Sequence, residues 1–243
     1  MLRQQYQDLE PKARGILSFQ EIFAIQRIIL TGCGDSHAAA MATKYTFEQL
    51  TGIPTEIVPA LDLSRYYADK QLGFAPLNPL VIAVSNSGGV ARVGEAIQRA
   101  VRAGAFALAV TGNRDSLLAK SASRVMDLEI PPLLKRAGVR SYMVSVLSLI
   151  LLAIRIGEVR GRYTMDQANA YRKDLLAQAD QLDALLPDMD AKCLAVAQSW
   201  KDFEAYDYVG AGMDYAAAWY GHAKAFEATG NTPCASTPRS GCT

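Results

Sequence analysis

Short apolar runs alternate with helical patterns from Arg27 to Ile130. Five of these runs are typical of strands: RIIL (27–30), TEIV (55–58), LVIAV (80–84), FALAVT (106–111) and VMDLEI (125–130). Apolar residues with helical spacing fill three of the gaps, over 36–50, 90–104 and 115–122. Because parallel neighbours need crossover connections, the alternation predicts an α/β fold with a doubly wound five-stranded parallel sheet.

From Ser141 onward the pattern is mainly helical. It predicts helices over 141–156, 165–186 and 191–200, and Pro187 is expected to end the second of them. The most apolar run, VSVLSLILLAI (144–154), has 11 residues, short of the roughly 20 that span a bilayer. We therefore expect a buried helix there and no membrane partner.

A strand–glycine turn–helix pattern occurs twice in the chain. The second copy has YDYV (206–209), the glycines of GAG (210–212) and a helix over 215–228, which indicates a duplicated but incomplete α/β unit. The last residues, NTPCASTPRSGCT (231–243), are typical of a loop or tail. The expected parts are an N-terminal helical segment (1–25), a first lobe (26–157), connecting helices (158–200), and the start of a second, truncated lobe with a tail (201–243).

Composition excludes several classes of function. The net charge is +1 and no long basic stripe is visible, so a nucleic-acid partner is not expected. The two histidines and four cysteines show no ligand spacing, and neither a metal nor a cofactor is expected. Four scattered thiols and a polar N-terminus without a signal-peptide core predict a cytoplasmic protein.

Two small polar turns carry the candidate chemistry, GCGDSH (32–37) and VSNSGGV (84–90). Each follows a predicted strand and precedes a predicted helix, so backbone N–H groups and the helix dipole favour an anion there. Serine hydroxyls add donors while keeping the turn small. The candidate donors are Gly34, Ser36, Ser85, Ser87, Gly88 and Gly89.

These turns lack the residues of the two common nucleotide-binding motifs. A dinucleotide fingerprint would need a third glycine where His37 stands, and no acidic residue follows TEIV at the expected place. Neither turn has the GK[ST] of a nucleotide-phosphate loop. Two merely tight connections remain the alternative to a phosphate site.

Four segments in order resemble the sugar isomerase (SIS) domain, and in particular the isomerase half of glucosamine-6-phosphate synthase and the two-lobed phosphosugar isomerases and deaminases. They are GCGDSHAAA (32–40), GIPTEIVPALDLSRY (52–66), VSNSGGVARV (84–93) and TGNRDSLLAKSA (111–122). The resemblance covers about 25–156 and resumes at 206–228. It implies a five-stranded parallel sheet, two lobes, a homodimer and a bound sugar phosphate.

The resemblance also implies roles for particular residues. Ser85, Asn86, Ser87 and Val90 fall in the family's phosphate turn, and Ser36 falls where the first turn contacts the sugar. GVRSY (138–142) is similar to a family loop, which makes Val139 and Ser141 candidate sugar contacts. YGHAKAFE (220–227) resembles a family helix that places Lys224 and Glu227 on a catalytic lysine and a carboxylate base.

The spacing of Tyr220, Lys224 and Glu227 puts them on one helix face, which suits a base with a nearby cation. The alternative is a surface salt bridge between Lys224 and Glu227. Tyr220 departs from the family's glutamate, and the residues after Glu227 lack the family's histidine-containing segment.

Three more side chains near these motifs carry expectations. His222 lies off the Tyr220–Lys224–Glu227 face and is expected to be structural. His37 suits either a ligand contact or a packed role, and Asp35 is expected to cap the helix that follows.

Two classes of function follow from these features. The first is an enzyme, an aldose–ketose isomerase or an amino-sugar-phosphate deaminase that uses a carboxylate base. The second is a module that senses a sugar phosphate without converting it. A purely structural α/β fragment would leave the serine-rich turns unexplained.

Overall fold

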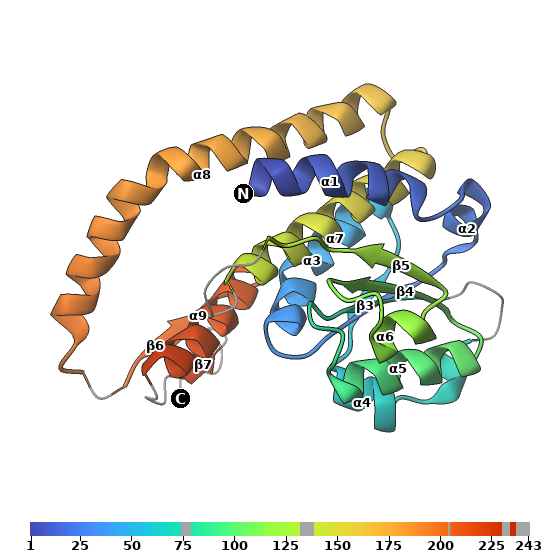
Figure 1. The fold of residues 1–243 in the computed structure, drawn as a ribbon, viewed down its shortest axis with the longest axis horizontal. Helices are drawn as coiled ribbons and strands as arrows, with labels where there is room; N and C mark the ends of the chain where they lie inside the picture. The colour runs from blue at the N-terminus through green and yellow to red at the C-terminus, as the bar shows by residue number, and fades with distance from the viewer. Residues whose placement is uncertain (74–78, 132–138, 204, 230–233, 237–243) are drawn as a thin grey trace.

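The computed structural model describes residues 1–73, 79–131, 139–203, 205–229 and 234–236. Five strands form one parallel sheet in the order β2-β1-β3-β4-β5 (Figure 1). The strands are β1 (Ile28–Thr31), β2 (Thr55–Ile57), β3 (Leu80–Val84), β4 (Phe106–Thr111) and β5 (Arg124–Asp127). The predicted fold class and all five strands are confirmed.

Helices cover both faces of this sheet (Figure 1). One face is covered by α1 (Leu2–Gly15), α3 (Asp35–Thr51) and α7 (Val139–Val159), and the other by α4 (Ala60–Arg65), α5 (Ala91–Arg102) and α6 (Leu117–Ser121). Ser116 caps α6, with its Oγ accepting from the Ala119 N–H. A short helix α2 (Phe19–Ala24) and a 3₁₀ turn η1 (Asp69–Gln71) complete this part.

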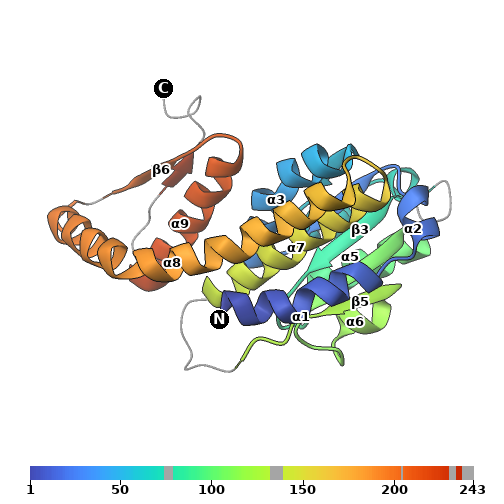
Figure 2. The same ribbon diagram turned by 90° about the horizontal axis from the view of Figure 1, so that it is seen from above.

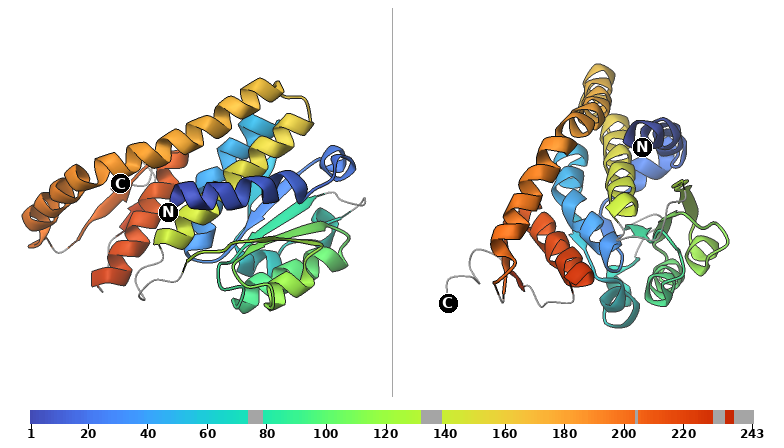
Figure 3. Two further views of the ribbon diagram at one scale, coloured as in Figure 1. Left: turned by 45° about the horizontal axis from the view of Figure 1, so that its top comes forward. Right: turned by 60° about the vertical axis from the view of Figure 1, so that its left-hand side comes forward.

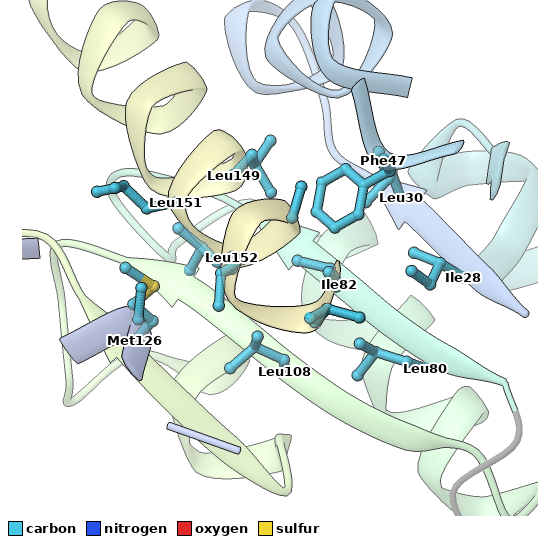
Figure 4. Packing of buried hydrophobic residues seen from close by; sticks show 14 of the residues in the cluster. Ile28, Leu30, Phe47, Leu80, Ile82, Leu108, Met126, Leu149, Leu151 and Leu152 are labelled. Atoms are coloured by element: carbon cyan, nitrogen blue, oxygen red, sulfur yellow. The ribbon is translucent and has the colours of Figure 1, made fainter. Parts of the chain in front are cut away.

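Alternate residues of the strands enter two separate cores. Ile28 and Ile82 pack with Phe47 of α3 and Leu152 of α7 (Figure 4). Their neighbours Ile29 and Val81 pack on the opposite side, against α4 and α5. This double burial explains why the strands are continuous apolar runs rather than alternating ones.

The carboxyl ends of β1 and β3 form the switch point of the sheet. The strands are neighbours in register, with Thr31 opposite Ala83. The chain leaves β1 through α3 on one face and leaves β3 through α5 on the other. Open α/β sheets bind ligands in the crevice where the connections diverge in this way, and both glycine turns begin there.

The apolar helix α7 is longer than the run that predicted it. Its 21 residues make it long and apolar enough to cross a membrane, so length does not exclude a span as the sequence suggested. Its most apolar window is 61% buried inside the structure, where it packs on β1, β3 and β4. The expectation of a buried helix is confirmed by this packing.

One long helix replaces two predicted ones. Helix α8 runs from Met165 to Trp200 with Pro187 inside it, so the expected end at Pro187 is wrong. Proline removes one helical N–H and crowds the carbonyl four residues earlier. Here the flanking residues are exposed, so water can satisfy that carbonyl, and α8 bends instead of ending (Figures 1 and 2).

The C-terminal part contains β6 (Asp207–Val209), α9 (Met213–Thr229) and β7 (Cys234–Ser236). β7 pairs in parallel with β6, so residues 234–236 are not the loop or tail that the sequence predicted, and the second unit has two strands rather than one. Short strands with little apolar content escape pattern recognition. Helix α9 lies against α3 (Figures 2 and 3). The proposed four-part division of the chain stays a prediction.

Candidate functional site

The serine turn between β3 and α5 has a buried first residue and exposed residues after it. Ser85 is 3% exposed, and its N–H continues the sheet by donating to the Val110 carbonyl. Asn86 and Ser87 are exposed, and Ser87 Oγ accepts from the Gly89 N–H at 3.3 Å. The Ser87 hydroxyl proton therefore remains available to a ligand.

Two glycines at this turn lie too close to neighbouring atoms to carry a side chain. Gly88 has φ +63°, and a Cβ there would lie 2.2 Å from Ser116 Oγ. A Cβ on Gly112, after β4, would lie 2.9 Å from Asn86 Oδ1. Neighbouring turns thus pack against Gly88 and Asn86. The Ala91 and Arg92 amides at the start of α5 come before the first amides that donate to the Val90 carbonyl, so the helix itself offers them no acceptor. The turn fits an anion bound by backbone and hydroxyl donors.

Val90 differs in kind from the other residues of the turn. It is the N-cap residue of α5, with no side-chain cap hydrogen bond, and is 39% exposed. A valine side chain offers no donor, so any contact of Val90 with an anion would use its backbone.

The first turn holds a carboxylate. Gly34 is the N-cap of α3, with φ +55°, and its carbonyl accepts from the N–H of His37 and Ala38. The Ser36 N–H donates to the Cys33 carbonyl. Asp35 does not cap α3, contrary to expectation: no side-chain cap hydrogen bond is formed at Gly34, and the carboxylate turns to Lys224.

Lys224 of α9 joins two carboxylates. Its Nζ lies 2.8 Å from Asp35 Oδ1 and 2.5 Å from Glu227 Oε2. The side chains of Lys224 and Asp35 are largely buried, 16% and 28% exposed, whereas Glu227 is 54% exposed. Both interpretations of the Lys224–Glu227 pair, a catalytic pair and a plain salt bridge, stay predictions. The two side chains form a salt bridge, and Lys224 also contacts Asp35 in the first turn.

The protonation of Lys224 follows from this environment. Burial alone would lower its pKa, but hydrogen bonds to Asp35 and Glu227, together with the charges of both carboxylates, raise the pKa above its ordinary value. Lys224 is therefore an ammonium at neutral pH. It is suited to stabilise negative charge and not to act as a base or nucleophile.

Two stacked phenols close one side of this cluster. Tyr220 of α9 stacks on Tyr142 of α7 with ring centroids 3.9 Å apart, and Lys224 Nζ lies 5.4 Å from the Tyr220 centroid. Burial, followed by the charge of Asp35, raises the pKa of Tyr220 to about 12 and also raises the pKa of Tyr142. Both phenols stay neutral, and Tyr220 Oη is buried with no partner within the described structure.

The histidines occupy packed positions. His37 meets Trp219 of α9 edge-on, with centroids 5.9 Å apart. Burial lowers the pKa of His37, opposed in part by the charge of Asp62, so the imidazole is neutral at pH 7. The Nδ1 atoms of His37 and His222 are buried with no partner within the described structure. The contact with Trp219 fits a packed role for His37, and the Nδ1 that has no partner among the described residues fits a ligand contact, so both alternatives stay predictions.

The remaining candidates lie at the start of α7. Val139 is exposed and Ser141 is half-buried, one turn or less before Tyr142. Gly138, which begins the quoted GVRSY segment, lies outside the described residues. The Tyr142–Tyr220 stack brings this helix start to α9 and the first turn.

The described residues offer little for other chemistries. No group of three His, Cys, Asp or Glu side chains among them is placed to hold a metal ion. Cys33, in the first turn, is a half-buried free thiol whose pKa burial raises, so it is a poor nucleophile.

Several contacts of this site could not have been found from the sequence. Asp35 as the partner of Lys224 and Tyr142 as the partner of Tyr220 join elements far apart in the chain. The one signal in the sequence is an acidic residue in an anion-binding turn, and local capping rules interpret it as a helix cap rather than as the partner of a cation. The roles of all the candidate residues stay predictions.

Comparison with known proteins places this geometry in a family. A family model for the SIS domain matches residues 21–155. The glutamine–fructose-6-phosphate aminotransferase (isomerizing) of Symbiobacterium thermophilum is 31% identical over 205 residues, covering 83% of this chain and 32% of that protein. The chain spans about a third of the length of the curated relatives it matches.

Solved structures share the fold at low identity. The C-terminal domain of glucosamine-fructose-6-phosphate aminotransferase from Francisella tularensis has a TM-score of 0.83 at 16% identity, covering 97% of this chain and 68% of that one. A Clostridium difficile 630 protein, provisionally assigned as a phosphosugar isomerase, has a TM-score of 0.86 at 16% identity, covering 98% and 67%. The chain belongs to the SIS domain family, and the solved structures that share its fold include proteins provisionally assigned as phosphosugar isomerases.

Proposed function

We propose that this chain binds a sugar phosphate and interconverts its aldose and ketose forms. The observation that carries the proposal is the contact of Lys224 with Asp35, which brings the Lys224–Glu227 pair to the carboxyl edge of the sheet. The serine turn begins on the neighbouring strand at the same edge. This shared edge of the sheet supports the pairing of a phosphate site with a base and a cation.

The serine turn supplies the phosphate site. Ser87 donates its hydroxyl, the amides at the start of α5 add donors, and the α5 dipole adds partial positive charge. The buried Ser85 supports the turn from beneath.

Glu227 and Lys224 supply the chemistry. The Glu227 carboxylate takes the proton from the carbon next to the sugar carbonyl, and the electron pair moves onto the carbonyl oxygen as an enediolate. The Lys224 ammonium stabilises that charge. Glu227 then returns the proton to the other carbon while the hydroxyl proton shifts between the oxygens, so the atoms balance and no cofactor is consumed.

Hydrogen exchange tests this reaction directly. Fructose 6-phosphate incubated with the chain in deuterium oxide should gain deuterium at the carbon next to the carbonyl, measured by proton NMR. Glu227→Gln should abolish exchange while phosphate-dependent binding persists. Binding without exchange by the unaltered chain would reject the isomerase.

A sensing module is the second candidate. It is favoured by Tyr220, which stands where the family has a glutamate, and by the two carboxylates that already engage Lys224. A deaminase is a variant of the first candidate. Ammonia release from glucosamine 6-phosphate would identify it, and no release with intact isomerisation would exclude it.

We also propose a cytoplasmic homodimer. Free thiols at Cys33 and Cys193 suit a reducing compartment. The apolar face of α7 is buried in the core of its own chain and is therefore not available to a dimer interface. Helix α8 still exposes apolar side chains, namely Leu182, Leu185, Leu186, Met189 and Trp200. Light scattering after gel filtration gives the molecular mass that decides this point.

A further inference from the structure

The Asp35 carboxylate has two features that its place in a phosphate-binding fold does not explain. It lies at the first residue of α3, where the helix dipole favours a negative group, yet that charge opposes an anionic ligand. It also accepts no capping hydrogen bond from the helix amides, and instead accepts one from the ammonium of Lys224, 189 residues away.

Without Asp35, the ion-pair partner of Lys224 would be Glu227, a residue of the same helix. Glu227 is three residues from Lys224 and 54% exposed, so that pair alone leaves the ammonium mobile at the surface. Asp35 contacts Lys224 Nζ through both oxygens, at 2.8 and 2.9 Å, from a separate and rigid element. The bond fixes the ammonium beside the first turn.

We propose that Asp35 is a positioning residue that holds the Lys224 ammonium at the sugar end of the crevice and shares it with Glu227. This inference rests on the proposed function. Asp35 binds the ammonium through both oxygens and keeps it beside the first turn, while Glu227 pairs with the same ammonium through one oxygen and remains 54% exposed. The Tyr220 ring, stacked on Tyr142, lies 5.4 Å from Lys224 Nζ and restricts where the ammonium can move.

The groups that face the ammonium come from two helices, Asp35 of α3 and Tyr220 and Glu227 of α9. Tyr220 is neutral, so the local charge is set by two carboxylates and one ammonium. Replacing Asp35 by its neutral isostere removes one of the two anions and leaves the packing nearly unchanged. Asp35→Asn therefore separates the effect of the Asp35 charge from the effect of its side-chain volume.

The test compares Asp35→Asn, Asp35→Glu and a matched control, Asp188→Asn, which removes the carboxylate of an exposed Asp–Lys pair on α8. The first readout is the pKa of the Lys224 ammonium in the 243-residue chain, measured by nitrogen NMR of its labelled side chain. Asp35→Asn should lower that pKa, Asp35→Glu should keep it raised, and the control should leave it unchanged.

The second readout is deuterium exchange into fructose 6-phosphate. Asp35→Asn should lower kcat by about 100-fold with KM within about twofold, because misplacement affects the transition state and phosphate binding lies on the other turn. Asp35→Glu should recover only part of the rate, because its carboxylate is displaced by one methylene. The Asp188→Asn control should retain the full rate.

The Lys224 pKa tests the positioning role of Asp35, and deuterium exchange by the unaltered chain tests the isomerase proposal. An unchanged Lys224 pKa in Asp35→Asn overturns the positioning role whatever the activity. A lowered pKa with full kcat overturns it as well. If the unaltered chain shows no exchange, the isomerase proposal fails, and the Lys224 pKa alone then decides whether Asp35 positions the ammonium.

Discussion

Lys224 and Asp35 lie 2.8 Å apart although 189 residues separate them in the chain. The contact ties α9, in the C-terminal part, to the first turn of the five-stranded unit. Trp219 against His37 and Tyr220 against Tyr142 strengthen the same junction. The candidate base–cation pair therefore lies against the first turn, at the carboxyl end of β1.

Ser87→Ala should weaken the binding of a sugar phosphate by about 1–2 kcal/mol, or roughly 5–30-fold, because one charge-assisted hydrogen bond is lost. Isothermal titration with fructose 6-phosphate measures the change. Ser199→Ala is the matched control, since that serine lies on α8 and donates to its own helix. Equal affinity for Ser87→Ala and the control would move the phosphate site elsewhere.

Gly88→Ala should destabilise the protein by roughly 2–5 kcal/mol, because a positive φ strains a Cβ and Ser116 Oγ occupies its space at 2.2 Å. Gly104→Ala isolates the strain, since Gly104 has φ +93° and no neighbouring atom within 4 Å of its added Cβ. Urea unfolding of both variants separates the two terms. A smaller loss for Gly88→Ala than for Gly104→Ala would contradict the packing described at this turn.

Arg172→Met should cost about 3–5 kcal/mol, because it breaks a largely buried network. Arg172 is 5% exposed, lies 2.6 Å from Glu158 Oε2 and also pairs with Glu10 at 3.2 Å. Lys192→Met, in an exposed pair with Asp188, should change the free energy of unfolding by less than about 1 kcal/mol. Similar losses in the two variants would contradict the burial argument.

The same network should give an acid-dependent stability. Burial would raise the pKa of Glu158, but hydrogen bonds and charge from Arg172 and Arg155 together lower it. A carboxylate with a lowered folded-state pKa contributes stability above its unfolded pKa, and this contribution is lost as pH falls through the folded value. Unfolding free energies from about pH 6 to pH 3 should fall less steeply in Arg172→Met than in the unaltered chain; parallel curves would refute this.

Pro187→Ala should strengthen α8, because proline in a helix interior costs up to about 3 kcal/mol relative to alanine. Amide hydrogen exchange over residues 180–195 should slow in the variant, and the change should stay local since these residues are exposed. Faster exchange would indicate that Pro187 supports α8 through contacts that alanine lacks.

The five-stranded unit could be predicted from the sequence because burial on both faces leaves a clear signal. LVIAV and FALAVT match β3 and β4 residue for residue. The signal fails where burial is slight. Helix α8 is mostly exposed beyond Ala179, so no apolar pattern runs through Pro187 and the proline alone predicts a helix end there. Strand β7 has only three residues, which is too few to show a pattern.

The candidate site could be predicted only within each segment. Local spacing located the serine turn and the face that bears Lys224 and Glu227. The local capping rule predicts that Asp35 caps α3, and this prediction fails because the partner of the Asp35 side chain comes from α9. Contacts between distant elements depend on how helices pack, and one sequence carries no direct signal of that packing.

Amide chemical shifts test the central claim most directly, because they report where a ligand binds. Fructose 6-phosphate added to the nitrogen-labelled chain should shift amides over 86–92 most strongly, with smaller shifts over 33–37. Fructose without the phosphate should leave residues 86–92 unchanged. Shifts centred on α8, or no shifts with fructose 6-phosphate, would contradict a sugar phosphate bound at the serine turn.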